Sequence, residues 1–97
     1  MIIVIGTADA AAGQEDRVRA LSLEHVHRSR QEPGCIRHEV NVDCERPGRF
    51  VFVEYWRDMD ALNAHFALPA SRSFMDELRP LLASAPSLEI FQSDAVN

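Results

Sequence analysis

In one segment, Arg49 to Arg57 (RFVFVEYWR), both the odd-numbered and the even-numbered residues are mostly apolar. Aromatic and β-branched residues favour a strand, and successive side chains of a strand point to opposite faces of its sheet. Both faces of this strand therefore need cover, but one layer of helices covers only one face of an antiparallel sheet. The simplest cover for the other face is the same sheet of a second copy, so the sequence predicts a homodimer that packs sheet to sheet.

The neighbouring segments alternate between strand and helix patterns, with Asp58 as a good N-cap and Pro69 as a helix interruption. The expected order is strand 2–8, helix 14–31, strand 35–43, strand 49–57, helix 59–67, a last helix opened by Ser71 or Ser73, and strand 88–91. This βαββα(α)β order is the ferredoxin-like pattern, an α+β fold with an antiparallel sheet. We expect residues 1–97 to form one such domain.

The dipeptide Pro47-Gly48 predicts a tight turn between the two middle strands. Residues 36, 38, 40 and 42 alternate as one face of the first of these strands. On the tight-turn register, Val51, Val53 and Tyr55 share that face, while Glu54 lies on the opposite one. A longer loop or a slip of one residue would exchange the faces.

The charge balance excludes several classes of function. Fifteen acidic residues stand against ten basic ones, for a net charge of −5. Nucleic-acid binding needs a basic face, and no basic run exists, so we expect no nucleic-acid partner. All the basic residues are arginine. Without lysine, a Schiff-base mechanism, a pyridoxal-phosphate anchor and a Walker-type phosphate loop are excluded.

The apolar start of the chain, residues 1–5, is too short to span a bilayer and lacks the basic flank of a signal peptide. We therefore expect a cytoplasmic protein without a membrane partner. Cys35 and Cys44 fit no metal or redox spacing. A disulfide between them is conceivable, but reduced thiols are expected, with Cys35 packed rather than nucleophilic.

Three segments together resemble the antibiotic biosynthesis monooxygenase domain family of small dimeric α+β barrels. They are Glu32-Pro33-Gly34-Cys35, the strand Phe50 to Trp56 (FVFVEYW), and Ala61 to His65 (ALNAH) followed by Ser73-Phe74. The resemblance spans nearly the whole chain. It implies two ferredoxin-like protomers, each with a pocket between its sheet and its helices. The family includes cofactor-independent oxygenases of quinols and phenols, haem-degrading enzymes and isomerases, so the fold alone does not fix the reaction.

His65 matches the histidine of the common family pattern and is the leading catalytic candidate. A neutral imidazole beside the pocket could remove a phenolic proton. The substrate would then supply the electrons for oxygen, so no cofactor is expected. The alternative is a capping or core histidine. Haem degradation is disfavoured because the first strand, Val4-Ile5-Gly6-Thr7, lacks the asparagine of that branch.

Glu54 is an acid in an otherwise apolar strand and the second catalytic candidate. It could orient His65. It could equally pair with Arg37 across the hairpin or with Arg57, and this structural pairing is the favoured interpretation. Burial would raise the pKa of Glu54, and a nearby arginine would lower it.

Two further histidines, His25 and His38, occupy positions that share a helix or strand face with apolar residues. His25 follows Leu21 at helical spacing, and His38 lies on the more apolar face of its strand, so both could converge with His65 on one cavity. His25 and His27 are about 200° apart on a helix and cannot chelate together. The spacing favours polar pocket lining, and no metal is expected. The substrate-binding candidates, which could also be plain core, are His38, His25, Tyr55, Trp56, Phe66, Phe74 and Leu78.

These observations lead to one main hypothesis and two alternatives. The main hypothesis is a homodimeric, cofactor-independent monooxygenase of a quinol-like or phenolic small molecule, with His65 as the base. The first alternative is an isomerase or detoxifying enzyme that moves a proton on a small carbonyl metabolite. The second is a non-enzymatic dimer that binds an apolar ligand.

Overall fold

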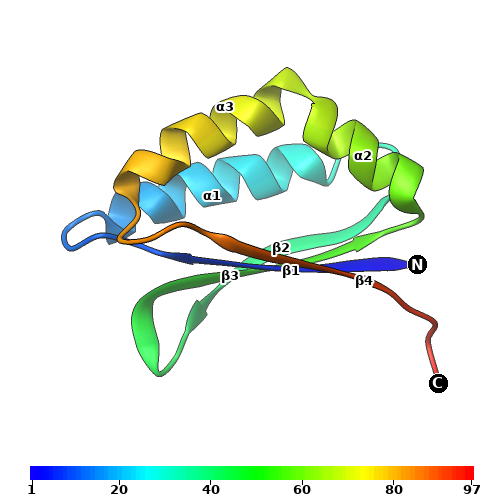
Figure 1. Cartoon of the computed structure of the whole chain (residues 1–97), viewed down its shortest axis with the longest axis horizontal. Coiled ribbons are helices and arrows are strands. Elements are labelled where there is room, and N and C mark those ends of the chain that lie inside the picture. Colours follow the sequence, from blue (N-terminus) through cyan, green and yellow to red (C-terminus); the bar gives the residue numbers. More distant parts are fainter.

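A single four-stranded antiparallel sheet carries all the helices on one face (Figure 1). The computed structural model describes residues 1–97. Its elements are β1 (Ile2–Asp9), α1 (Glu15–Ser29), β2 (Cys35–Asp43), β3 (Arg46–Trp56), α2 (Met59–Ala67), α3 (Pro69–Leu78), a 3-10 turn (Arg79–Leu81) and β4 (Ser87–Gln92). The strands lie in the order β2-β3-β1-β4. The predicted α+β class and order of elements are confirmed.

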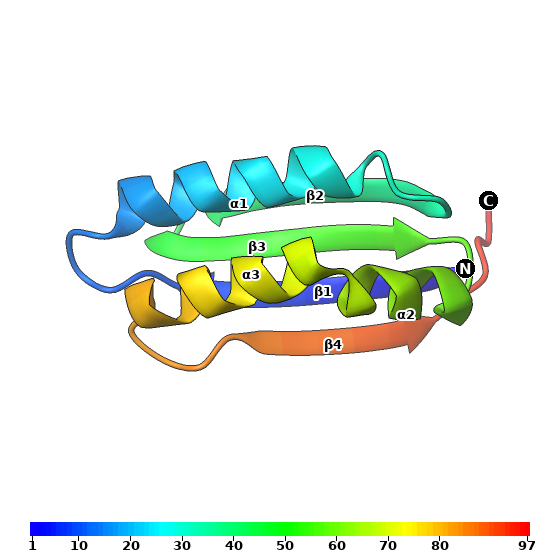
Figure 2. The same cartoon turned by 90° about the horizontal axis from the view of Figure 1, so that it is seen from above.

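Seen from above, α1 lies over β2, and α2 and α3 follow one another over the β1 side of the sheet (Figure 2). The sheet face beneath them carries the even-numbered residues from 2 to 8 in β1 and from 50 to 56 in β3, which are buried. Removing these apolar side chains from water drives the packing of the two layers. One core cluster comprises Val18, Val26, Phe50, Phe52, Phe74 and Leu78. The other comprises Ile2, Val4, Trp56, Ala61 and Leu62.

The hairpin register differs from the one that Pro47-Gly48 predicts. The turn is at residues 44–45, and Pro47-Gly48 lies inside β3. Asp43 pairs with Arg46 but Val42 pairs with Phe50, so residues 47–49 form an irregularity in β3. The tight-turn register is therefore wrong. The buried face of the hairpin carries the three large rings of Phe50, Phe52 and Trp56, and burying them decides the register over the local turn signal.

A second irregularity lies at the start of β2. Cys35 pairs with Trp56 and Arg37 with Tyr55, which leaves Ile36 without a partner. Its side chain is 58% exposed. The prediction that Ile36 shares the face of His38 is therefore wrong, because a bulge adds one residue and interrupts the alternation.

Local signals place the first two helices well. Asp58 caps α2 as predicted, its carboxylate accepting a hydrogen bond from the backbone N–H of Ala61 at 2.9 Å. The last helix begins earlier than predicted, at Pro69 instead of Ser71 or Ser73. Proline suits the first turn of a helix because the N–H it lacks would have no partner there. None of the helices is both long and apolar enough to cross a membrane.

Gly34 brings the turn after α1 into contact with α2. Its φ of +82° is a left-handed conformation that favours glycine, and an added Cβ atom would lie 2.5 Å from the Cβ of Ala61. Only a residue without a side chain permits this approach. The same turn contains Glu32, so Gly34 determines how close Glu32 comes to α2.

The sheet face away from the helices is also apolar. Five apolar or aromatic residues of this face are half-buried and one, Phe91, is exposed; the five are Ile3, Ile5, Val51, Val53 and Tyr55. The helices, all on the other face, leave this face open (Figure 1). The sheet-to-sheet dimer remains a prediction, and this outer face is where it would form.

Candidate functional site

A cavity of about 630 Å³ lies between the sheet and the helices. Among the predicted site residues, six line it: His25, Glu54, His65, Phe66, Phe74 and Leu78. Gly6 and Phe52 form part of its floor, and Arg72 and Arg79 of α3 and the turn that follows it lie on its helical side. Apolar surface makes up most of the lining, although about half of the lining residues are polar or charged. Apolar surface with polar groups in it is the usual character of a small-molecule site.

His65 is held in one orientation by Glu32. The ring nitrogen Nδ1 of His65 lies 2.8 Å from Oε1 of Glu32, and Oγ of Ser71 lies 3.5 Å from the same nitrogen. A carboxylate can only accept, so Nδ1 carries the hydrogen and Nε2 is left with a lone pair. The ring is 3% exposed and packs against Trp56 at 4.7 Å between ring centroids. A histidine arranged in this way can accept a proton.

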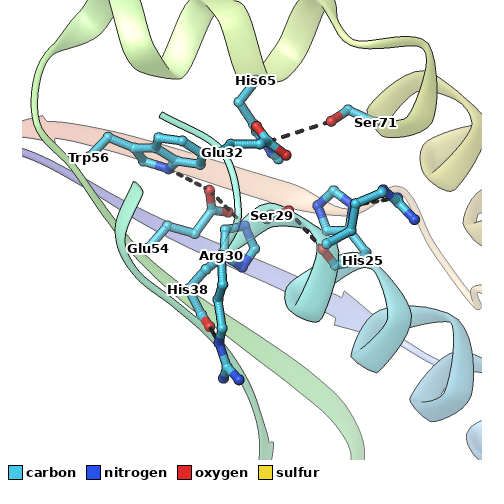
Figure 3. Close-up of polar contacts among 10 residues, drawn as sticks. His25, Ser29, Arg30, Glu32, His38, Glu54, Trp56, His65 and Ser71 are labelled. Carbon is cyan, nitrogen blue, oxygen red and sulfur yellow. Dashed lines mark hydrogen bonds and ion pairs between the residues drawn. The ribbon is translucent and has the colours of Figure 1, made fainter. Parts of the chain in front are cut away.

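Glu54 lies on the helix side of the sheet, not on the outer face. Its Oε1 accepts a hydrogen bond from the indole N–H of Trp56 at 2.9 Å and lies 3.2 Å from Nε2 of His38 (Figure 3). Burial acts to raise the pKa of Glu54, but His38 and the Trp56 N–H outweigh it and lower the pKa below its ordinary value. Glu54 therefore stays ionised near neutral pH.

The predicted partners of Glu54 are wrong. Arg37 pairs with Glu39 at 2.7 Å on the outer side, and Arg57 pairs with Asp58 at 3.2 Å. Glu54 does not orient His65 either, since the carboxylate hydrogen-bonded to that ring belongs to Glu32. The register explains the first error, because it turns Glu54 inward and Arg37 outward.

The three histidines converge, as the sequence suggests. The ring centroids of His25, His38 and His65 lie 5.2–5.6 Å from one another. They come from α1, β2 and α2, and their side chains meet between the sheet and the helices (Figure 3). His25 also stacks on Phe74 at 4.0 Å. Burial, and then the positive charge of nearby groups, lowers the pKa of His25 to about 3, so this ring is neutral at physiological pH.

Three predicted substrate-binding residues lie away from the cavity wall. His38 and Trp56 are fully buried beneath it and act on it only through neighbours. Tyr55 is on the outer face, where its hydroxyl accepts a hydrogen bond from Arg37 at 3.2 Å. A role for Tyr55 in this pocket is therefore wrong, because the register places it on the opposite side of the sheet.

Sequence reasoning missed the partner of the candidate base. Glu32 appears in the pattern as the residue before Pro33-Gly34 and so as part of a helix end. Nothing local indicates that its carboxylate reaches α2. Both cysteines are free thiols, and burial raises the pKa of Cys35, in keeping with a packed thiol.

A sequence model of the antibiotic biosynthesis monooxygenase family matches residues 1–77. The chain belongs to this family.

Known proteins resemble this chain in sequence or in fold over nearly its whole length. The chain is 32% identical over 91 residues to an uncharacterized protein of Synechocystis, covering 94% of this chain and 62% of that protein. The chain thus spans less than two thirds of that relative. A candidate antibiotic biosynthesis monooxygenase of Deinococcus radiodurans superposes with a TM-score of 0.95 at 30% identity, covering 100% and 97% of the two chains. A Mycobacterium tuberculosis protein shares the fold at TM-score 0.92 and 21% identity, covering 99% and 98%.

Proposed function

We propose that the protein is a cofactor-independent monooxygenase of a quinol-like or phenolic small molecule, with His65 as general base. The observation that carries this proposal is the Glu32–His65 pair beside the cavity. Glu32 fixes the hydrogen on Nδ1, so the Nε2 lone pair can take the proton of a phenol. The resulting phenolate is a far better electron donor than the phenol.

The reaction balances without an added reductant. A phenol with a free ring carbon gives one proton to His65 and its electrons to molecular oxygen. The O–O bond breaks, one oxygen atom replaces the hydrogen of that carbon as the new carbonyl, and the ring becomes a quinone. The other oxygen atom leaves as water, which takes one proton from the protonated base and the second from the ring carbon. The substrate supplies all four electrons.

The cavity suits a flat apolar ring. Phe52, Phe66 and Phe74 line it from the sheet and from both of the later helices. Aromatic side chains bind planar ligands through stacked or edge contacts. Excluding water around the phenolate also strengthens each polar contact that stabilises it.

We also propose that the working form is a homodimer joined through the outer face of the sheet. Large exposed apolar patches on soluble proteins commonly mark interaction sites. The polar margin of the face, formed by Arg37, Glu39 and Asn41 on β2, fits the rim of such an interface. A second copy of the same sheet offers the matching surface.

Oxygen uptake with a panel of reduced quinols and dihydroxyarenes tests the proposal, with autoxidation subtracted. Protein freed of metal by chelation is compared with His65→Ala and with His27→Ala, an exposed histidine of α1. We expect uptake with the wild type and with His27→Ala. Loss of the base should reduce kcat by about 10²–10⁴-fold in His65→Ala.

Two outcomes would contradict the proposal. Uptake that is unchanged in a folded His65→Ala variant would remove His65 from the mechanism. Turnover of a carbonyl metabolite that continues without oxygen would favour the proton-transfer isomerase instead.

A further inference from the structure

The cluster of His25, His38 and His65 comes close to the spacing of a metal site. One ring nitrogen from each residue can be chosen so that all three lie within 4.8 Å of one another. A tetrahedral zinc ion with bonds of about 2.0–2.1 Å to three imidazoles sets their ring centroids about 5 Å apart. The centroids here are 5.2, 5.4 and 5.6 Å apart. We propose that these three histidines bind a divalent transition-metal ion of the zinc and cobalt class.

Two of the rings already lie beside a carboxylate, as metal-binding histidines usually do. In such sites one ring nitrogen binds the ion while the other faces a carboxylate, which fixes the ring. Nδ1 of His65 lies 2.8 Å from Glu32, and Nε2 of His38 lies 3.2 Å from Glu54. Each contact leaves the opposite nitrogen for an ion. The two carboxylates together would balance its double charge.

The burial of His38 gives a second reason. His38 is 1% exposed, and neither ring nitrogen makes a well-aligned hydrogen bond, since the contact with Glu54 is close but poorly directed. A buried polar group without a partner destabilises a fold. An ion coordinated by His38 would give this ring the partner that the protein chain does not supply.

His25 needs one rearrangement. Its Nδ1 lies 3.3 Å from a guanidinium nitrogen of Arg28, so in the neutral ring the hydrogen is on Nε2. Arg28 also donates to the carbonyl of Ala70 at 3.2 Å and pairs with Glu24 at 3.6 Å. Arg28 can therefore give up the contact with His25, and the ring proton can move to Nδ1 as Nε2 binds the ion.

The cavity supplies the remaining coordination position. His25 and His65 line its wall, whereas His38 lies beneath. A bound ion would therefore have three protein ligands and an open side toward the cavity, where water could bind. Coordination uses the Nε2 lone pair of His65. If His65 is the base proposed above, the ion and the proton compete for one nitrogen, and zinc inhibits turnover.

Cobalt binding tests the site without any substrate. Protein stripped of metal is titrated with Co²⁺ while its visible absorption is followed. We expect one equivalent per chain with the spectrum of a tetrahedral site, and displacement of Co²⁺ by Zn²⁺. His38→Gln should abolish this binding, and His27→Gln on the exposed face of α1 should leave it unchanged. Glu32→Gln, which keeps all three ligands, should weaken it by about 10–100-fold.

Three results would overturn the proposal. They are absence of a one-equivalent Co²⁺ spectrum in the wild type, equal binding in His38→Gln, and a sulfur-to-cobalt absorption band that places the ion on a cysteine. If His38→Gln fails to fold, the Co²⁺ titration of Glu32→Gln decides: weaker binding than in the wild type supports the proposal, and equal binding overturns it. Because binding is measured without substrate, failure of the oxygenase proposal would leave this result standing.

Discussion

Oε1 of Glu32 lies 2.8 Å from Nδ1 of His65, across 33 positions of the chain. The turn after α1 and the last turn of α2 are thus joined at the candidate base. The contact fixes which nitrogen of His65 carries the hydrogen and which way the ring faces. Glu32 is therefore a positioning residue in the proposed mechanism, although it does not line the cavity.

Changing Glu32 should lower kcat and leave KM nearly unchanged, because the substrate does not contact it. We expect Glu32→Ala to lower kcat by about 10–100-fold, less than removal of the base itself. Glu32→Gln should retain more activity, since its amide oxygen can still accept from Nδ1–H. Steady-state oxygen uptake measures both. The control is Glu77→Gln, an exposed glutamate of α3. Equal activity of Glu32→Gln and Glu32→Ala would argue against a positioning role.

Gly34→Ala should destabilise the fold strongly. A left-handed backbone costs a non-glycine residue about 1–2 kcal/mol, and overlap with Ala61 about 1–3 kcal/mol more. Urea unfolding measures the loss. In the double variant with Ala61→Gly, the free energy of unfolding should recover only the share lost to the overlap with Ala61. Gly48→Ala is the matched control, since its Cβ would meet only the carbonyl of Ala10 at 3.9 Å. Similar unfolding midpoints for the two glycine variants would contradict this account.

Val53→Arg should convert the proposed dimer to a folded monomer. Val53 lies on the outer face of β3, where a buried guanidinium without a partner would be costly at an interface but harmless in water. Light scattering after gel filtration gives the mass, and circular dichroism the fold. Asn41→Arg, at the polar margin on β2, should remain dimeric. A wild-type mass of one chain would refute the dimer.

Asp58 should stabilise α2 only when ionised. Its hydrogen bond from the Ala61 N–H, and then Arg57, lower its pKa below the ordinary value of 3.8. A lowered pKa in the folded state means stability that is present above pH 3.8 and lost as the pH falls through the folded-state pKa. Asp58→Ala should therefore melt below the wild type at neutral pH, with the difference shrinking in strong acid. Asp60→Ala, the control, should lower the melting temperature less. A difference in melting temperature between Asp58→Ala and the wild type that does not change with pH would contradict the role of the ionised cap.

The parts of the structure that the sequence predicted are those determined by near neighbours. The order of strands and helices follows from periodicity, the start of α2 from the capping side chain of Asp58, and the inward direction of His25 from helical spacing. These signals extend over a few residues, and distant packing did not override them.

The site depended on contacts that no local pattern contains. The Glu32–His65 pair exists because Gly34 lets a turn approach α2, and both halves of that contact look ordinary in isolation. The sequence predicts the wrong faces for Tyr55 and Glu54 because Pro47-Gly48 is a strong local turn signal. Burial of the large rings on the other face of β3 overrides that signal. Residue type drew attention to the three histidines and Glu54, but only the strand register decided which side chains share a space.

The irregularity at residues 47–49 has a consequence for any change in the length of the hairpin tip. Burial of Phe50, Phe52 and Trp56 fixes the pairing of residues 50–56 with β1 and β2, so one residue inserted at 47–49 would enlarge the irregularity and leave both faces of β3 as they are. Glu54 would still face His38, and Val53 and Tyr55 would stay on the outer face. The hairpin tip can therefore change in length by a residue without rearranging the cavity.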